Sequence, residues 1–99
     1  MRLSAEHRAL LKQEFIRQLG ADHELKLFGS RLNDEARGGD VDLLVISPKP
    51  IEKRVGVACN LAARAERLLG GRRVDVLLID PNTALLPIHH IAIKAGQPL

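Results

Sequence analysis

The sequence is poor in aromatic residues. Its 99 residues include two phenylalanines, Phe15 and Phe28, and neither tryptophan nor tyrosine. Because bases would find no aromatic platform on which to stack, nucleic acid is not favoured as the main partner. The net charge of +3 instead suits a protein that handles phosphates or docks on an acidic partner. The core must consist of leucine, isoleucine, valine and alanine.

Cysteine is almost absent as well. The single cysteine, Cys59, excludes an internal disulfide and a zinc site built from several cysteines. It lies in the apolar run 57–61, which predicts a small core residue rather than a reactive thiol.

Long apolar runs are also missing. No stretch approaches the ~18 residues that a membrane span needs, and the amino terminus lacks the charged-then-apolar layout of a signal peptide. We therefore expect a cytoplasmic protein with no membrane partner. The length predicts one domain over residues 1–99.

Hydrophobic periodicity predicts alternating helices and strands. Ser4 precedes an amphipathic stretch that ends at Gly20, which predicts a helix over residues 5–19 with Ser4 as its cap. Strands are expected over 24–28, 40–46 and 73–79, and further helices over 52–69 and, capped by Thr83, over 83–95. This order predicts an α/β sandwich whose mixed sheet has at least three strands, with helices packed against it. The apolar strand 40–46 should lie inside that sheet.

Two aspartates open the strand expected over 40–46. Residues i and i+2 of a strand point to the same face, so Asp40 and Asp42 should lie side by side, with Cα atoms roughly 6.5–7 Å apart. Like charges at ~4 Å repel by about 4 kcal/mol at an effective dielectric near 20. A Mg²⁺ ion held by carboxylates and substrate phosphates offsets that repulsion. The structural alternative places Asp40 in a turn and leaves Asp42 solvated at the strand end.

Gly29 and Ser30 follow the strand expected over 24–28. A glycine lets the backbone approach a phosphate, successive N–H groups can cradle an anion, and the serine hydroxyl adds a hydrogen bond. The same pair is also typical of an ordinary turn. If the strand that ends at Phe28 lies beside the strand that starts at Asp40, the phosphate cradle and the carboxylate pair meet at one site.

Asp75 interrupts an otherwise apolar strand, where an unpaired carboxylate would be costly to bury. It should lie either at the exposed start of that strand or toward the metal site. Asp80 is the competing third carboxylate, but Asp80-Pro81 is typical of a turn. Asp75 is therefore the preferred candidate.

The motif around these residues resembles that of a known superfamily. Leu27-Phe28-Gly29-Ser30-Arg31 and Asp40-Val41-Asp42, with nine residues between Ser30 and Asp40, are similar to the motif of the nucleotidyltransferase superfamily that includes DNA polymerase β. The likeness continues through the strand around Asp75 to the closing segment 91–99 and covers nearly the whole chain. In length and element order the chain resembles the minimal nucleotidyltransferase (MNT) proteins.

This resemblance implies a Mg²⁺-dependent enzyme that transfers a nucleotidyl group, AMP from ATP, to a hydroxyl acceptor. The catalytic and metal-binding roles fall on three aspartates, Asp40, Asp42 and Asp75. The last of these would either complete the metal site or deprotonate the acceptor. The nucleotide phosphates would be held by Gly29, Ser30 and Arg31.

The resemblance also implies a protein partner. Small relatives of this type pair with helical HEPN toxins as their antitoxins, in some cases by transferring AMP to a tyrosine of the toxin. The expected function is therefore that of the antitoxin in a HEPN/MNT toxin–antitoxin pair, with the acceptor on the partner. Self-association into a homo-oligomer is left open.

The phosphate loop departs from the family pattern in one place. Many relatives have a second glycine where this chain has Asp34, after Asn33, and either Arg31 or Arg37 could supply positive charge there. The departure favours an alternative function, a catalytically weak or inactive binding module of the same fold that neutralises its partner by contact. The retention of all three aspartates favours the enzyme.

Other polar residues are weaker candidates. Adjacent helical residues point about 100° apart, so His89 and His90 cannot jointly ligate one ion and are expected to be solvated or to face a partner. Four arginines near the end of the second expected helix form either a solvated face or a partner site: Arg64, Arg67, Arg72 and Arg73.

Overall fold

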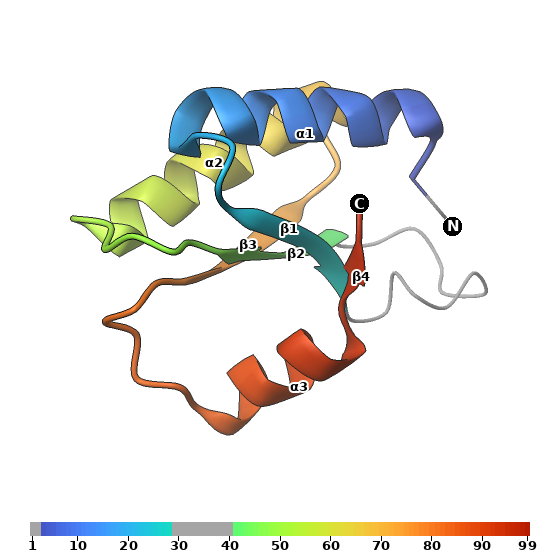
Figure 1. Ribbon diagram of the computed structural model, residues 1–99. Coiled ribbons are helices and arrows are strands. Elements are labelled where there is room, and N and C mark those ends of the chain that lie inside the picture. Colours follow the sequence, from blue (N-terminus) through green and yellow to red (C-terminus); the bar gives the residue numbers. More distant parts are fainter. Residues whose placement is uncertain (1–2, 29–40) are drawn as a thin grey trace.

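A four-stranded mixed sheet lies at the centre of the fold (Figure 1). The computed structural model describes residues 3–28 and 41–99. The strands follow the order β3-β2-β1-β4 and are β1 (Glu24–Phe28), β2 (Val41–Ile46), β3 (Val74–Ile79) and β4 (Gln97–Pro98). β2 is parallel to β3 and antiparallel to β1, and β1 is antiparallel to β4. The predicted mixed sheet of at least three strands is confirmed, and β2 lies inside it.

Helices cover both faces of this sheet. α1 (Ala5–Leu19) and α2 (Arg54–Leu68) pack on one face, and α3 (Pro87–Ala95) packs on the other (Figure 1). The α/β sandwich expected from the sequence is therefore present. None of the helices in the described ranges is long and apolar enough to cross a membrane.

The predicted bounds of the first helix are confirmed. The Ser4 hydroxyl accepts a hydrogen bond from the His7 N–H at 3.0 Å, which satisfies one of the free donors at the helix start. The helix ends at Gly20, whose φ of 87° is open to glycine but strained for other residues.

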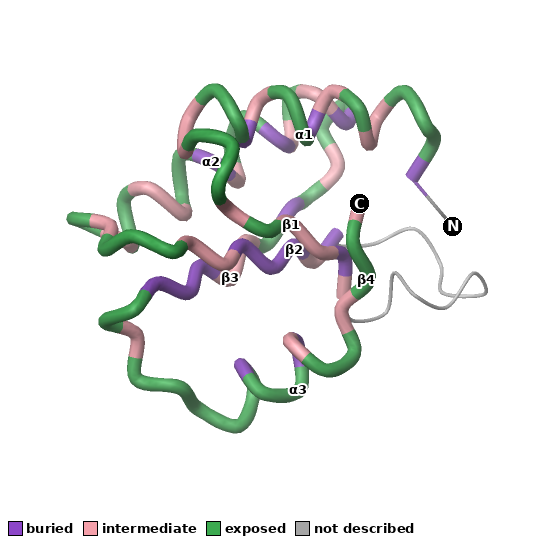
Figure 2. The backbone as a smooth tube through the Cα atoms, viewed as in Figure 1, coloured by how far each residue is buried: buried purple, intermediate pink, exposed green. Residues whose placement is uncertain are grey.

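Side-chain alternation along β2 explains its continuous apolar sequence. Val41, Leu43 and Val45 are fully buried against the core under α1 and α2, while Leu44 is fully buried in the smaller core under α3. Both faces of the strand are thus covered, as Figure 2 shows in the purple stretch of β2. Asp42 alternates with Val41 and Leu43 and so belongs to the α3 side of the sheet.

The predicted starts of the second and third helices are wrong. α2 begins at Arg54 rather than at residue 52, because Lys53 adopts a left-handed conformation with φ 54°. α3 begins at Pro87 rather than at residue 83. Thr83 does not cap it, because its hydroxyl donates to Asp80 at 2.9 Å and accepts from Arg54.

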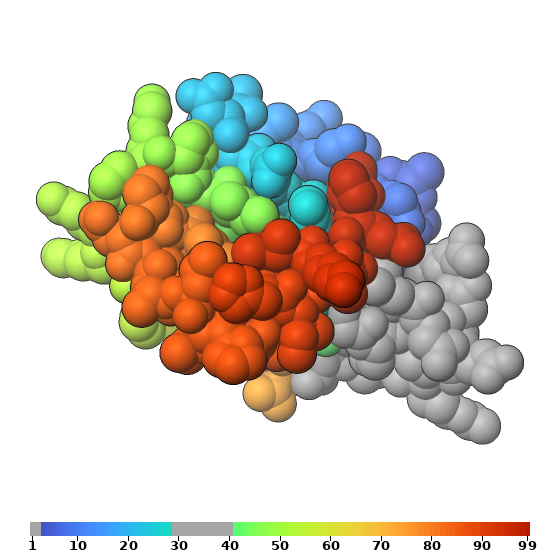
Figure 3. All heavy atoms as spheres, turned by 60° about the horizontal axis from the view of Figure 1, so that its bottom comes forward, coloured from blue at the N-terminus to red at the C-terminus, as the bar shows by residue number. Residues whose placement is uncertain are grey.

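The short strand β4 was not expected from the sequence. It follows α3 across Gly96, and the Leu99 N–H donates to the Leu25 carbonyl at 3.2 Å. A Cβ on Gly96 would lie 2.7 Å from the Ala92 carbonyl oxygen and 3.2 Å from the Lys26 Cβ. Only glycine permits this close approach, which fixes the end of α3 against β1. Figure 3 shows the C-terminal segment, in red, on the side of the molecule that carries α3.

Cys59 is exposed on α2, so the prediction that it is a core residue is wrong. The helix turns Leu61 and Ala65 toward the core, and both are almost fully buried. Cys59 precedes Leu61 by two residues, which places it on another side of the helix.

Candidate active site

Two of the predicted carboxylates are neighbours across the sheet. In the parallel pairing of β2 with β3, Asp42 is in register with Asp75, and in the antiparallel pairing of β1 with β2, Phe28 is in register with Asp42. Strands are about 4.8 Å apart, so residues in one such row share a face and lie about that far from each other. Residues 33 positions apart in the chain therefore present adjacent carboxylates on the α3 side of the sheet.

These carboxylates lie at the open start of their strands. The Asp75 side chain is 53% exposed, although the strand that follows it is largely covered, and Asp42 is half-buried. Asp75 thus lies at the exposed start of its strand, one of the two positions that the sequence allowed, and is in register with Asp42. Such a pair is accessible to a ligand from solvent.

Charge repulsion between the two carboxylates works against this arrangement. Two carboxylates about 5 Å apart repel by ~3 kcal/mol at an effective dielectric near 20, and the solvent around Asp75 lowers that figure. Arg73 offsets part of it, because its Nε lies 3.9 Å from the Asp75 Oδ1. Both side chains of this ion pair are more than half exposed, so its contribution is small.

Arg73 also lies beside the carboxylates. The sequence predicts it in a basic cluster at the end of α2, but it precedes Asp75 by two residues and so shares a face with it. That i, i+2 spacing is the signal that could have identified it. Of the other arginines in the group, Arg64 lies 3.7 Å from Glu14 of α1 and so contributes to the contact between helices.

The remaining predicted site residues lie outside the described part of the chain. These are Gly29, Ser30, Arg31 and Asp40, together with Asn33, Asp34 and Arg37 of the same segment. The structure does describe the two strands that this segment joins. Phe28, the residue before Gly29, belongs to the same row as Asp42. The expected juxtaposition of the strand that ends at Phe28 with the strand that begins at residue 41 is confirmed.

Asp80, the competing carboxylate, has a structural role. Its side chain is buried and accepts hydrogen bonds from the Ile51 N–H at 2.8 Å, the Asn82 N–H at 3.0 Å and the Thr83 hydroxyl at 2.9 Å. The bond from Ile51 chiefly lowers the pKa of Asp80, with burial opposing it and Thr83, Asn82 and Arg54 adding to it. The turn that Asp80-Pro81 predicted is present. Asp80 lies five residues beyond Asp75, roughly 16 Å away along the strand, so the two cannot share one ion.

The two histidines differ from each other. His90 is exposed as expected, but His89 is buried, so the prediction that it is solvated is wrong. Its Nδ1 accepts a hydrogen bond from the Leu86 N–H at 2.8 Å and so caps the start of α3. A histidine near a helix start with no Ser, Thr, Asp or Asn cap before it is the sequence signal for this role.

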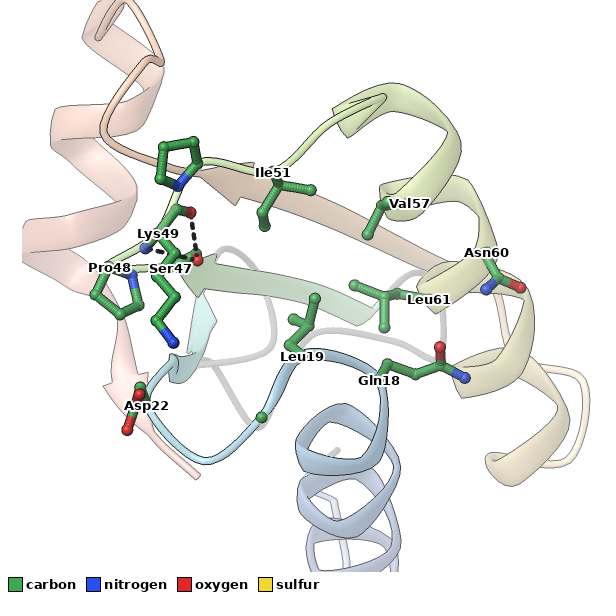
Figure 4. Close-up of a pocket in the computed structure, with 12 residues that line it drawn as sticks. Gln18, Leu19, Asp22, Ser47, Pro48, Lys49, Ile51, Val57, Asn60 and Leu61 are labelled. Carbon is green, nitrogen blue, oxygen red and sulfur yellow. Dashed lines mark hydrogen bonds between the residues drawn. The ribbon is translucent and has the colours of Figure 1, made fainter.

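A pocket in the described part of the chain lies at the other end of the sheet. It has a volume of about 390 Å³ and lies between the end of α1, the connection from β2 to α2, and α2 itself (Figure 4). Leu19, Ile51 and Leu61 converge on it, while Asp22 and Lys49 lie at one end. Ser47 on its wall follows Asp42 by five residues, so the pocket is roughly 16 Å from the carboxylate pair. It is not part of the candidate active site.

Comparison with known families decides how the carboxylate pair is to be understood. A family model for the nucleotidyltransferase domain matches residues 9–95, which include both strands and both carboxylates. The chain belongs to the nucleotidyltransferase domain family. Transfer of a nucleotidyl group is the general activity of this family. No curated protein matches the chain.

Solved structures share the fold of this nucleotidyltransferase domain. A chain in the crystal structure of a toxin–antitoxin with AMP-PNP is 20% identical, with a TM-score of 0.63 over 96% of this chain and 72% of that chain. A chain in the structure of a tri-AMPylated Shewanella oneidensis HEPN toxin in complex with MNT antitoxin is 20% identical. Its TM-score is 0.55 over 92% of this chain and 70% of that chain. A chain in the crystal structure of the toxin–antitoxin MntA-HepT is 20% identical, with a TM-score of 0.54 over 91% of this chain and 69% of that chain. At this identity the likeness shows the fold.

Proposed function

We propose that this domain is a Mg²⁺-dependent nucleotidyltransferase that transfers AMP from ATP to a hydroxyl group on a helical partner protein. It would act as the MNT antitoxin of a HEPN/MNT toxin–antitoxin pair. The single observation that supports the proposal best is the register between Asp42 and Asp75, which brings two carboxylates together at an accessible edge of the sheet. The family supplies the reaction class, and the register supplies a site for it.

The residues present suit Mg²⁺. Carboxylate oxygens are the protein ligands that this ion prefers, and it usually keeps several waters and binds substrate phosphates as well. Within residues 3–28 and 41–99 no group of three or more His, Cys, Asp or Glu could hold a metal, so the described part supplies two ligands, Asp42 and Asp75. Asp40, two residues before Asp42, is proposed as the third. The bound ion would neutralise charge on the phosphates of the nucleotide.

The reaction needs positioning more than covalent chemistry from the protein. The acceptor hydroxyl attacks the α-phosphorus of ATP in line, the bond to the β-phosphate oxygen breaks, and pyrophosphate leaves while AMP stays on the acceptor. Asp75, the more exposed carboxylate, either accepts the hydroxyl proton or completes the metal site. We assign the phosphates to Gly29, Ser30 and Arg31, because Gly29 follows Phe28 directly and Phe28 is in register with Asp42.

The partner is proposed from the structures that share this fold. One of them contains a HEPN toxin that is AMPylated three times in complex with an MNT antitoxin, and another contains AMP-PNP. Both support ATP as the nucleotide and a helical protein as the acceptor. The net charge of +3 suits both a nucleotide and an acidic surface on the partner.

The experiment is a search for the adduct. The protein is incubated with a co-expressed HEPN protein, ATP and Mg²⁺, and the intact mass of each chain is measured. We expect one or more adenylyl groups on the HEPN chain, none without Mg²⁺, and none with Asp42→Asn. Lys49→Gln serves as the control, because Lys49 lines the pocket at the other end of the sheet and should leave the adduct unchanged.

The alternative function makes a different prediction. A binding module of the same fold would give no adduct with any nucleotide or metal, and tight binding to the partner would survive Asp42→Asn. That result would rule out the enzyme and support the binding module.

A further inference from the structure

Exposed apolar side chains gather on the outer side of α3. Six large apolar side chains in the described residues are exposed, and four of them fall within residues 85–91. They are Leu85 at 45%, Leu86 at 56%, Ile88 at 49% and Ile91 at 61% exposure. A soluble surface that concentrates its large apolar residues in one short segment commonly marks an interaction site.

The packing of α3 on the sheet does not account for these residues. His89, Ala92 and Ile93 are the side chains that α3 turns inward, where Ala92 and Ile93 join Leu44 and Ile79 in the smaller core. Ile88 and Ile91 are three positions apart on the outward side, so they lie on one stripe of the helix. α3 therefore has a second apolar face in addition to the one that it buries.

A groove separates α2 from the segment that leads into α3. The groove has a volume of about 340 Å³, and its walls include Val55 and Ala58 of α2, Ala84 before α3, and His89. Val55 is 80% exposed and is a fifth member of the six exposed apolar side chains. In Figure 3 the orange and red segment of residues 81–95 forms one surface beside the yellow-green start of α2. We call Val55, Leu85, Leu86, Ile88 and Ile91 the α3 outer face.

Basic side chains lie at two places beside the α3 outer face. Residues 81–99 contain no aspartate or glutamate, and the basic side chain among them is Lys94, exposed in the last turn of α3 next to His90. Arg54 lines the α2 side of the groove, and Lys53 and the acidic Glu52 precede it in the sequence. Arg54 keeps its side chain 39% exposed while it contacts Asp80. A ligand for this face would combine apolar anchors with acidic flanks.

We propose that the α3 outer face docks an amphipathic helix of a partner protein, with apolar side chains on one stripe and acidic side chains beside it. An apolar groove next to a helix accepts such a stripe through anchors at i, i+3 or i+4, and i+7. A second copy of this chain fits less well, because a symmetric contact through this face would bring Lys94 and Lys53 of both copies together. The proposal does not depend on nucleotidyl transfer.

The probe is a pair of synthetic helical peptides with the same leucine stripe. One carries glutamates beside the stripe and the other carries lysines, and each is titrated into the full chain by calorimetry. We expect the acidic peptide to bind about tenfold more tightly or better, and the difference to shrink at high salt because surface charges are then screened. Equal affinity for both peptides, or binding of neither, would overturn the proposal.

Matched variants locate the binding. Ile88→Glu and Ile91→Glu should each abolish binding of the acidic peptide, whereas Ile16→Glu, at a residue of α1 that is 47% exposed, should leave it unchanged. Lys94→Glu should reduce the preference for the acidic peptide without removing the apolar contact. Circular dichroism of each variant verifies the fold. Binding that survives both α3 variants, or a dimeric mass in solution that Ile91→Glu reverts to a monomer, would contradict the proposal.

Discussion

The two ends of β3 each carry an aspartate, and the two are used in opposite ways. Asp75 at the start is exposed, lies beside another carboxylate and has an arginine at 3.9 Å. Asp80 just past the end is buried, and three hydrogen bonds of 2.8–3.0 Å occupy its oxygens. A carboxylate that is buried and hydrogen-bonded within the fold is closed to a ligand from solvent. One placed beside a like charge in solvent gains stability when a cation arrives.

The largest expected effect is on AMP transfer at the carboxylate pair, Asp42 and Asp75. Asp42→Asn removes one negative charge from the pair while keeping its shape, so AMP transfer should fall by about a thousandfold or more. The variant should remain folded, because asparagine keeps the size and shape of the side chain. Adduct formation and thermal melting measured on one preparation separate the two effects. Transfer at the wild-type rate would remove Asp42 from the mechanism.

The second expected effect is on the stability that the buried Asp80 provides just past the end of β3. Asp80→Asn leaves the Ile51 and Asn82 amides and the Thr83 hydroxyl without a full set of acceptors, so the melting temperature should fall by roughly 10 °C. The variant that remains folded should still transfer AMP at assay temperatures well below melting. A variant that melts like the wild type would show that the buried network contributes little.

Acid pH sharpens the same contrast. The pKa of Asp80 is lowered in the fold from the ordinary value of 3.8, so its stabilising contribution is present above that value and is lost as the pH falls through it toward the folded pKa. The melting temperature of the wild type should therefore fall between pH 5 and pH 3, and that of Asp80→Asn should fall less.

Glu14 supplies the control for this titration. Its pKa is also lowered, chiefly by the hydrogen bond from Gln18, so part of the acid sensitivity should remain in Asp80→Asn and disappear on adding Glu14→Gln. An identical pH profile for wild type and Asp80→Asn would show that Asp80 is not responsible.

The smallest expected effect is of Mg²⁺ alone. At several times its dissociation constant an ion stabilises the folded state by about 1 kcal/mol, which raises the melting temperature by a few degrees. Asp75→Asn should abolish this rise, and Asp80→Asn should retain it. A rise of equal size in Asp75→Asn would point to binding elsewhere.

Much of this contrast was visible in the sequence. Strand periodicity predicted both strands, the turn chemistry of Asp80-Pro81 separated the two aspartates, and Ser4 and Gly20 marked both ends of α1. These features depend on local residue preferences, which a sequence displays directly.

The features that were not predicted depend on tertiary contacts. Thr83 has the residue type of a helix cap, but Asp80 and Arg54 engage its hydroxyl, so α3 starts later and His89 caps it. Pro98 lacks an N–H and so argues against a strand, yet β4 at the edge of the sheet tolerates it because Gly96 lets the chain approach β1.

Metal binding by variants at the two ends of β3 is the sharpest test of whether Asp75, and not Asp80, is a metal ligand. Mn²⁺, which prefers the same oxygen ligands as Mg²⁺, can be counted by electron paramagnetic resonance in the wild type, Asp75→Asn and Asp80→Asn. We predict that the wild type and Asp80→Asn bind the ion and that Asp75→Asn binds it at least about tenfold more weakly. Binding that survives Asp75→Asn and is lost in a folded Asp80→Asn would contradict it.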